Sequence, residues 1–125
     1  CLLAFATGTS WGTFGILIPI VQSVFPMSDP LAIICISACM AGAVCGDHCS
    51  PISDTTIMAS AGAQCDHVNH VSTQLPYAIS CAAIAGITYV IAGVLSIVGA
   101  PGLLALPVGV VLTLGFLLLM KRKAA

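Results

Sequence analysis

The chain has 125 residues and a formal net charge of −1, and 59% of its residues are hydrophobic while only 6% are charged. A soluble domain normally carries about 25% charged residues, so this composition excludes a water-soluble globule and indicates an integral membrane protein whose main partner is the lipid bilayer. The lack of a basic stripe excludes nucleic-acid binding, because contacts to phosphates depend on clustered Lys and Arg side chains.

Residues 1–25 contain two apolar arms, CLLAFA and ILIPIVQSVF, separated by the glycine- and threonine-rich run TGTSWGTFG. Pro19 disturbs the second arm because it removes an internal helical hydrogen bond. This pattern fits either a re-entrant hairpin with its tip in the glycine and threonine run, or a crossing helix with a break there. Because the chain begins inside an apolar run, we expect it to be a piece of a longer protein.

Residues 30–64 are predicted to form a broken helix. The stretch PLAIICISACMAGAVC is typical of one helical piece and TTIMASAGAQ of a second, and the polar run GDHCSPISD separates them. An external loop is the alternative, but the first piece would then have to cross alone and reaches only about 24 Å, short of a hydrocarbon core of about 30 Å. We therefore expect a break at membrane depth, sheltered inside the protein because unpaired backbone groups are costly in lipid.

Two ordinary membrane helices are predicted at 76–98 and 103–120, with the turn signal GAPG between them. Proline at the start of the first is favourable because its missing N–H costs least there. Lys121, Arg122 and Lys123 follow the second helix, and the positive-inside rule places them in the cytoplasm. The C-terminus and the polar connection at 65–74 should then be cytoplasmic.

Asp47 and Asp54 are the two carboxylates of the polar run, with Pro51 between them. An ionisable group at membrane depth indicates an ion or proton path. Carboxylates and unwound carbonyls suit Na⁺, and burial disfavours a charged carboxyl, so protons can compete with the cation for the same group. The alternative role for both residues is capping of the two half-helices, which does not exclude ion binding.

A membrane zinc enzyme with an aspartate as base is the alternative from a different class. Its ligands would come from two groups, Cys45, His48 and Cys49, and Cys65, His67 and His70. Their spacing matches no familiar zinc motif, so most cysteines are interpreted as packing residues. His67 and His70 are interpreted as polar side chains at a cytoplasmic helix end.

The run GDHCSPISDTTIMASAGAQCDHVNHVSTQLPYA at 46–78 closely resembles the signature region of the NhaC family of Na⁺/H⁺ antiporters, and ATGTSWGTFGILIPI at 6–20 resembles that family's preceding motif. The resemblance implies exchange of Na⁺ for H⁺ across a bacterial cytoplasmic membrane, without a cofactor and without an enzymatic reaction. Related members exchange organic anions such as malate and lactate, so a Na⁺-coupled anion antiporter is the alternative. The chain would be the C-terminal part of such a protein, and the missing N-terminal half would supply the other side of the site. We also consider a homodimer.

The resemblance further implies an all-α, ion-transporter-superfamily-like fold, in which a re-entrant hairpin and a broken transmembrane helix meet near mid-membrane and two ordinary transmembrane helices follow. The hairpin tip would be 7–12 and the break 46–55. Our hypothesis places Na⁺ and H⁺ on Asp47 and Asp54, with His48 as a proton partner. The neutral oxygen donors in this hypothesis are the hydroxyls of Thr7, Thr9, Ser10, Ser50, Ser53, Thr55 and Thr56.

Overall fold

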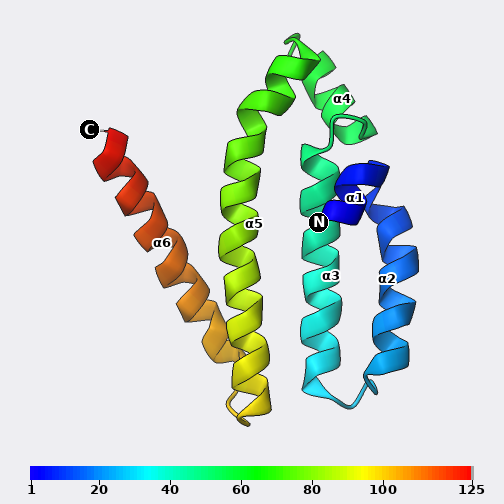
Figure 1. Ribbon diagram of the computed structural model, residues 1–125, viewed down its shortest axis with the longest axis vertical. Helices are drawn as coiled ribbons and strands as arrows, with labels where there is room; N and C mark the ends of the chain where they lie inside the picture. Colours follow the sequence, from blue (N-terminus) through cyan, green and yellow to red (C-terminus); the bar gives the residue numbers. More distant parts are fainter. Residues whose placement is uncertain (125) are drawn as a thin grey trace. The chain divides into compact units, whose positions relative to one another are not determined.

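The computed structural model describes the backbone of residues 1–124 and the side chains of residues 1–121, and within this part every regular element is a helix (Figure 1). The elements in chain order are α1 (Leu2–Thr7), α2 (Ser10–Val24), α3 (Pro30–Cys49), α4 (Asp54–Gly62), α5 (His67–Ile97), the short 3₁₀ helix η1 (Gly102–Leu104) and α6 (Ala105–Ala124). The side chains of Arg122 and Lys123, on which the predicted cytoplasmic C-terminus partly depends, lie outside the described residues.

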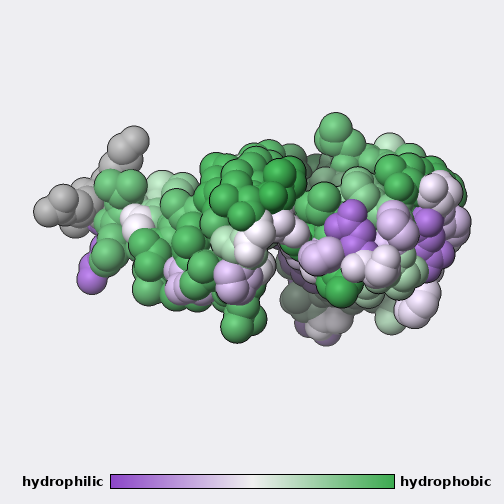
Figure 2. Space-filling view, turned by 90° about the horizontal axis from the view of Figure 1, so that it is seen from below, coloured by the Kyte–Doolittle hydropathy of each residue, from purple (hydrophilic) through white to green (hydrophobic). Residues whose placement is uncertain are grey.

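Three of these helices are long and apolar enough to cross a membrane, namely Pro30–Cys49, His67–Ile97 and Gly102–Lys121. Large apolar side chains such as Ile33, Val90 and Leu118 are exposed along them. Hydrophobic residues also cover most of the surface drawn in Figure 2. Such a surface suits a lipid solvent, so the predicted all-helical membrane class is confirmed.

Local capping explains where several helices begin. Thr9 Oγ1 accepts a hydrogen bond from the Gly12 N–H at 3.3 Å at the start of α2. Asp29 Oδ1 accepts one from the Leu31 N–H at 2.9 Å at the start of α3, which has proline as its first residue. Side-chain oxygens at this position satisfy N–H groups that have no partner inside the helix.

The helix α5 begins at His67, well before the predicted start at Pro76, which lies inside the helix. Asp66 accounts for the earlier start, because its Oδ1 accepts a hydrogen bond from the Asn69 N–H at 2.9 Å. A proline in the interior removes one helical hydrogen bond and crowds the carbonyl four residues earlier, yet here the helix continues past it. The connection predicted at 65–74 is therefore mostly helical.

The chain divides into two compact units, residues 1–82 and 83–125, which are described separately. In the first unit α1 and α2 both pack on α3, and α2 and α3 lie side by side (Figure 1). The buried apolar residues at these contacts are small, including Ala4, Ala32 and Ala43. Small side chains let helix backbones approach closely, which is how helices associate without a hydrophobic driving force in lipid.

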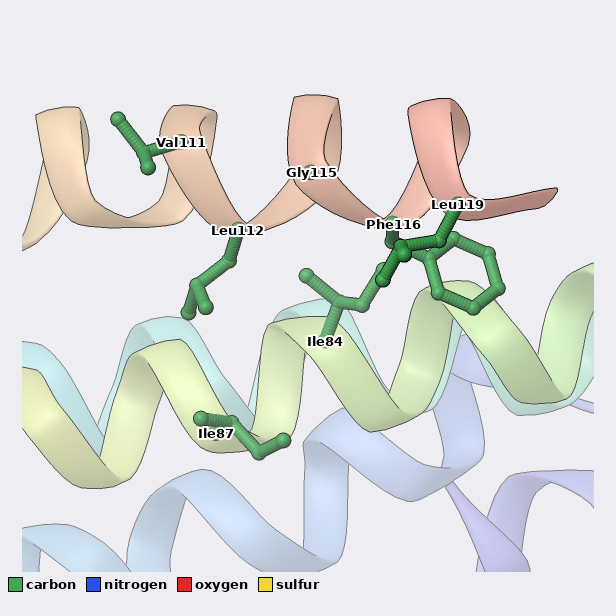
Figure 3. Close-up of a pocket in the computed structure, with 7 residues that line it drawn as sticks. All are labelled: Ile84, Ile87, Val111, Leu112, Gly115, Phe116 and Leu119. Atoms are coloured by element: carbon green, nitrogen blue, oxygen red, sulfur yellow. The ribbon is translucent and has the colours of Figure 1, made fainter. Parts of the chain in front are cut away.

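The second unit contains the C-terminal part of α5 and all of α6. An apolar groove of about 330 Å³ lies between the two helices, and Figure 3 shows the side chains that line it. These residues are Ile84, Ile87, Val111, Leu112, Gly115, Phe116 and Leu119. Nearer the turn, a Cβ on Gly109 would lie 3.0 Å from Thr88 Cγ2, so the helices touch closely there.

Candidate functional site

The polar run between α3 and α4 is helical except at four residues. Helix α3 continues through Asp47 and His48 to Cys49, and α4 begins at Asp54, so the non-helical segment is Ser50 to Ser53. We call these four residues the unwound segment. The structure therefore differs from the expected break at 46–55. With 20 residues, α3 is about 30 Å long and could cross a membrane alone, so the argument from a short helical piece is wrong.

Pro51 explains where α3 ends. Proline lacks an N–H and disfavours helical dihedrals in the residue before it. Ser50 accordingly has φ −72° and ψ 132°, which is extended backbone. Ser53, at the other end of the unwound segment, is also extended with φ −73° and ψ 136°.

The glycine and threonine run between α1 and α2 is likewise interrupted only briefly. Gly8 adopts a left-handed conformation with φ 65°, and Thr9 is extended with φ −146°. Ser10 and the residues after it already belong to α2. This interruption lies against the unwound segment, because a Cβ on Gly8 would lie 3.1 Å from the carbonyl carbon of Ile52.

The short helix α1 crosses α3 directly beside Asp47. A Cβ on Gly46 would overlap the carbonyl oxygen of Cys1 and lie 2.9 Å from the Phe5 nitrogen, so only glycine permits this approach. The approach also brings the Phe5 carbonyl to Ser50, whose buried hydroxyl donates a hydrogen bond to it at 2.7 Å. The unwound segment is thus tied to the end of α1.

Asp47 is a buried carboxylate with one direct hydroxyl partner. Only 8% of the residue is exposed, and its Oδ1 accepts a hydrogen bond from Ser53 Oγ at 2.6 Å. Ser53 is fully buried, and its Oγ lies 2.8 Å from Thr55 Oγ1. With Asp47 ionised, the single proton of Ser53 goes to the carboxylate, so the Thr55 hydroxyl must donate to Ser53. We refer to Asp47, Ser53 and Thr55 as the Asp47 cluster.

The last turn of α3 has carbonyl groups without helical partners, and two side chains satisfy one of them. The His48 carbonyl accepts a hydrogen bond from the buried Thr56 hydroxyl at 3.0 Å. It also accepts one from Gln74 Nε2 at 3.3 Å, contributed by α5. The imidazole of His48 is exposed and takes no part in these bonds.

Other residues of the sequence hypothesis lie apart from the Asp47 cluster. Asp54 is exposed as the first residue of α4, and Ser53 rather than Asp54 occupies the capping position. The hydroxyls of Thr7 and Thr9 bond within their own helical turns, to the Leu3 carbonyl and from the Gly12 N–H. Ser10 simply begins α2. Only one carboxylate of the predicted pair is buried.

His67 has a larger role than the sequence suggested. Its Nε2 lies 2.7 Å from the Pro51 carbonyl in the unwound segment, and its Nδ1 lies 3.0 Å from the buried Ser60 hydroxyl of α4. A carbonyl only accepts, so Nε2 must carry a hydrogen. The side chain therefore links three parts of the chain.

The cysteines and histidines do not gather into a metal site in the described part of the chain. All seven cysteines have free thiols. No three His, Cys, Asp or Glu side chains among the described residues come close enough to hold a metal ion. The zinc-enzyme alternative therefore has no ligand set there.

Sequence reasoning missed four contributors to this site. The Phe5 carbonyl is a backbone group with no side-chain signal, and Gly46 was not recognised as the crossing point of α1. His67 and Gln74 were assigned to a cytoplasmic connection. The available signal for Gln74 was its spacing of seven residues from His67, which places both polar side chains on one face of a helix.

Residues 1–94 match the family model described as the Na⁺/H⁺ antiporter family. The chain belongs to the Na⁺/H⁺ antiporter family. The resemblance noted at 6–20 and 46–78 is thereby confirmed at the family level, and both interruptions lie within the matched residues. Membership in the family and the three long apolar helices together identify a multi-pass membrane protein.

Relatives from two bacteria each match about three quarters of the chain. An uncharacterised protein of Haemophilus influenzae is 58% identical over 92 residues, covering 73% of this chain and 18% of the relative. A malate-2H(+)/Na(+)-lactate antiporter of Bacillus subtilis is 34% identical over 93 residues, covering 74% and 20%. An uncharacterised Na(+)/H(+) antiporter of H. influenzae is 34% identical over 92 residues, also covering 74% and 20%.

The matched region spans about a fifth of the length of these relatives. No solved structure matches the chain significantly.

Proposed function

We propose that the whole protein exchanges Na⁺ for H⁺ across a bacterial cytoplasmic membrane, and that both ions bind in turn at the Asp47 cluster. The observation that carries this proposal is the buried Asp47 carboxylate, which receives a 2.6 Å hydrogen bond from Ser53 in the unwound segment. Membership in the Na⁺/H⁺ antiporter family supports the choice of ions.

The chemistry of exchange follows from one carboxylate with two competing occupants. A buried carboxylate is costly without a counter-charge, so it is stabilised either by a cation or by a proton. Na⁺ prefers oxygen ligands, and the hydroxyls of Ser53 and Thr55 and the carbonyls of the unwound segment provide them close to Asp47. Because Na⁺ and H⁺ exclude each other, each ion leaves when the other arrives.

The architecture in the membrane belongs to the same proposal. We place α1 and α2 as a re-entrant hairpin that meets the unwound segment near mid-membrane, because Gly8 lies against Ile52. The polar turn before α5 and the C-terminus would face the cytoplasm. The part of the protein outside this chain would complete the ion site, and a homodimer is the assembly we propose for the whole.

A Na⁺-coupled organic anion exchanger is the second candidate, since one relative is named a malate-2H(+)/Na(+)-lactate antiporter. The N-terminus of α4 would be the anion site, because helix N-termini carry partial positive charge. Asp54 occupies the first turn of that helix and would repel a carboxylate. This local charge favours the cation exchanger.

The test uses the full-length protein in vesicles with an imposed pH gradient. Addition of Na⁺ should dissipate the gradient, Asp47→Asn should abolish this response, and Asp54→Asn should retain it within a few-fold because that side chain is exposed. Malate and lactate added with Na⁺ should leave the response unchanged. Full activity of Asp47→Asn would refute the proposed site, and a requirement for malate or lactate would favour the second candidate.

A further inference from the structure

Two side chains near the start of α5 donate hydrogen bonds to the backbone around the Asp47 cluster. His67 Nε2 bonds to the Pro51 carbonyl at 2.7 Å, and Gln74 Nε2 bonds to the His48 carbonyl at 3.3 Å. The two donors are seven residues apart, which is about two helical turns, so they project from the same face of α5.

The two carbonyls lie between Asp47 and Ser53 in the sequence, on the stretch of chain that joins two of the residues proposed to bind the ions. His48 follows Asp47 directly at the end of α3, and Pro51 stands between Ser50 and Ser53 in the unwound segment. The two donors on α5 therefore hold the backbone at His48 and at Pro51. The positions of these two carbonyls help to set the distance from Asp47 to Ser53.

Each donor has a second feature that points to a positioning role. The His67 ring is oriented by Ser60, whose Oγ is buried and lies 3.0 Å from Nδ1. Gln74 leaves its own Oε1 buried without a partner among the residues that the structure describes. An apolar side chain of similar size would avoid this unpaired acceptor, so the amide contributes through its donor group.

We propose that His67 and Gln74 are positioning residues of the ion site, and that the first two turns of α5 set the geometry of the unwound segment through them. This inference rests on the proposed exchange of Na⁺ and H⁺ at the Asp47 cluster. It gives α5 a direct influence on the site, since a shift of its first turns relative to α4 would move the Pro51 peptide and, with it, Ser53.

The experiment compares His67→Phe with His67→Gln in the full-length protein. Phenylalanine fills a similar volume without a donor, whereas glutamine can donate to the Pro51 carbonyl through its amide N–H. His70→Phe is the matched control, because His70 lies one turn further along α5 and makes no side-chain bond to the unwound segment among the described residues.

A second experiment uses Gln74→Met, which removes the second donor. Its control is Gln22→Met, because Gln22 is exposed on the surface of α2.

Two quantities are measured in vesicles: the Na⁺ concentration for half-maximal proton flux and the maximal flux. His67→Phe and Gln74→Met should each raise the half-maximal Na⁺ concentration about five-fold, the effect of losing one hydrogen bond, with a smaller change in maximal flux. His67→Gln should remain close to the wild type. Amide hydrogen exchange of the purified protein should become faster in residues 50–53 of His67→Phe, and this readout does not depend on transport.

The outcomes separate this inference from the proposed function. If His67→Phe behaves like His70→Phe in both flux and hydrogen exchange, or if His67→Gln is as impaired as His67→Phe, the positioning role is wrong while exchange by the wild type still stands. If the wild type shows no Na⁺-driven proton flux, the proposed function fails, and hydrogen exchange alone decides whether His67 holds the unwound segment. Should His67→Phe fail to fold, the comparison of Gln74→Met with Gln22→Met decides in the same way.

Discussion

Gly8 lies against Ile52 so closely that a Cβ on the glycine would come within 2.9 Å of Ile52 Cγ1. This contact joins two interruptions that are far apart in the sequence, one between α1 and α2 and the other between α3 and α4. Each interruption thereby restricts the movement of the other. The unwound segment beside Asp47 is held from the α1 side by this contact and from the α5 side by His67.

Gly8→Ala should destabilise the protein. The left-handed conformation, φ 65°, costs a residue with a Cβ about 1–2 kcal/mol, and the added methyl group also meets Ile52. Thermal unfolding in detergent should therefore occur at a lower temperature than in the wild type. Gly15→Ala is the control, because nothing lies within 4 Å of its Cβ position. Equal stability of the two variants would show that the two interruptions do not touch.

Gly46→Ala should be more damaging than any other glycine substitution in α3. Its methyl group would overlap the Cys1 carbonyl oxygen and lie 3.0 Å from Ala4 Cβ, so α1 would have to move away from α3. Overpacking of this kind costs about 1–3 kcal/mol. We expect a large loss of Na⁺-driven proton flux as well as lower thermal stability. Gly86→Ala on α5 has open space and should be neutral or slightly stabilising, and a similar result for Gly46→Ala would contradict the crossing.

The sequence predicted the class of fold because hydrophobic length and the lack of charge are properties of composition. It also placed the interruptions near Gly8 and Pro51, since glycine and proline act on the backbone locally. It overestimated their extent. Asp47 and His48 are polar yet helical, because the hydrogen bonds that satisfy the end of α3 come from Thr56 and Gln74, which no local pattern reveals.

Ser50→Ala should loosen the attachment of α1 to the unwound segment. The hydroxyl of Ser50 is fully buried and donates to the Phe5 carbonyl at 2.7 Å. Its loss leaves that carbonyl without this donor, at a cost of about 1–3 kcal/mol if it stays buried. Thermal unfolding should shift downward relative to Ser23→Ala, whose hydroxyl is exposed and bonds only to the Ile20 carbonyl of its own helix. No difference between the two serine variants would mean that the bond to Phe5 does not contribute.

The candidate site was predicted in part. Asp47, Ser53 and Thr55 were all named from residue type, and the structure brings these three together. The equal weight given to Asp54 came from its place in the polar run, since sequence cannot tell which of two acidic residues faces inward when the backbone turns between them. The contributions of α1 and α5 depend on tertiary packing. They became visible only through the short contacts at Gly46 and Pro51.

Ser53→Ala should weaken Na⁺ binding more than Thr55→Val, because the two hydroxyls stand at different distances from the carboxylate. Ser53 donates directly to Asp47 at 2.6 Å, whereas Thr55 reaches it only through Ser53. A hydrogen bond to a charged group contributes about 1.5–3 kcal/mol, so the half-maximal Na⁺ concentration should rise at least about ten-fold in Ser53→Ala. In Thr55→Val the rise should be only a few-fold, as Ser53 keeps its bond to the carboxylate.

The control is Ser72→Ala, which should behave like the wild type. Ser72 is exposed, and its hydroxyl bonds to the Asn69 carbonyl within α5. If Thr55→Val is the more impaired variant, the Thr55 hydroxyl contributes more to Na⁺ binding than the Ser53 hydroxyl, and the order of groups proposed for the Asp47 cluster is wrong.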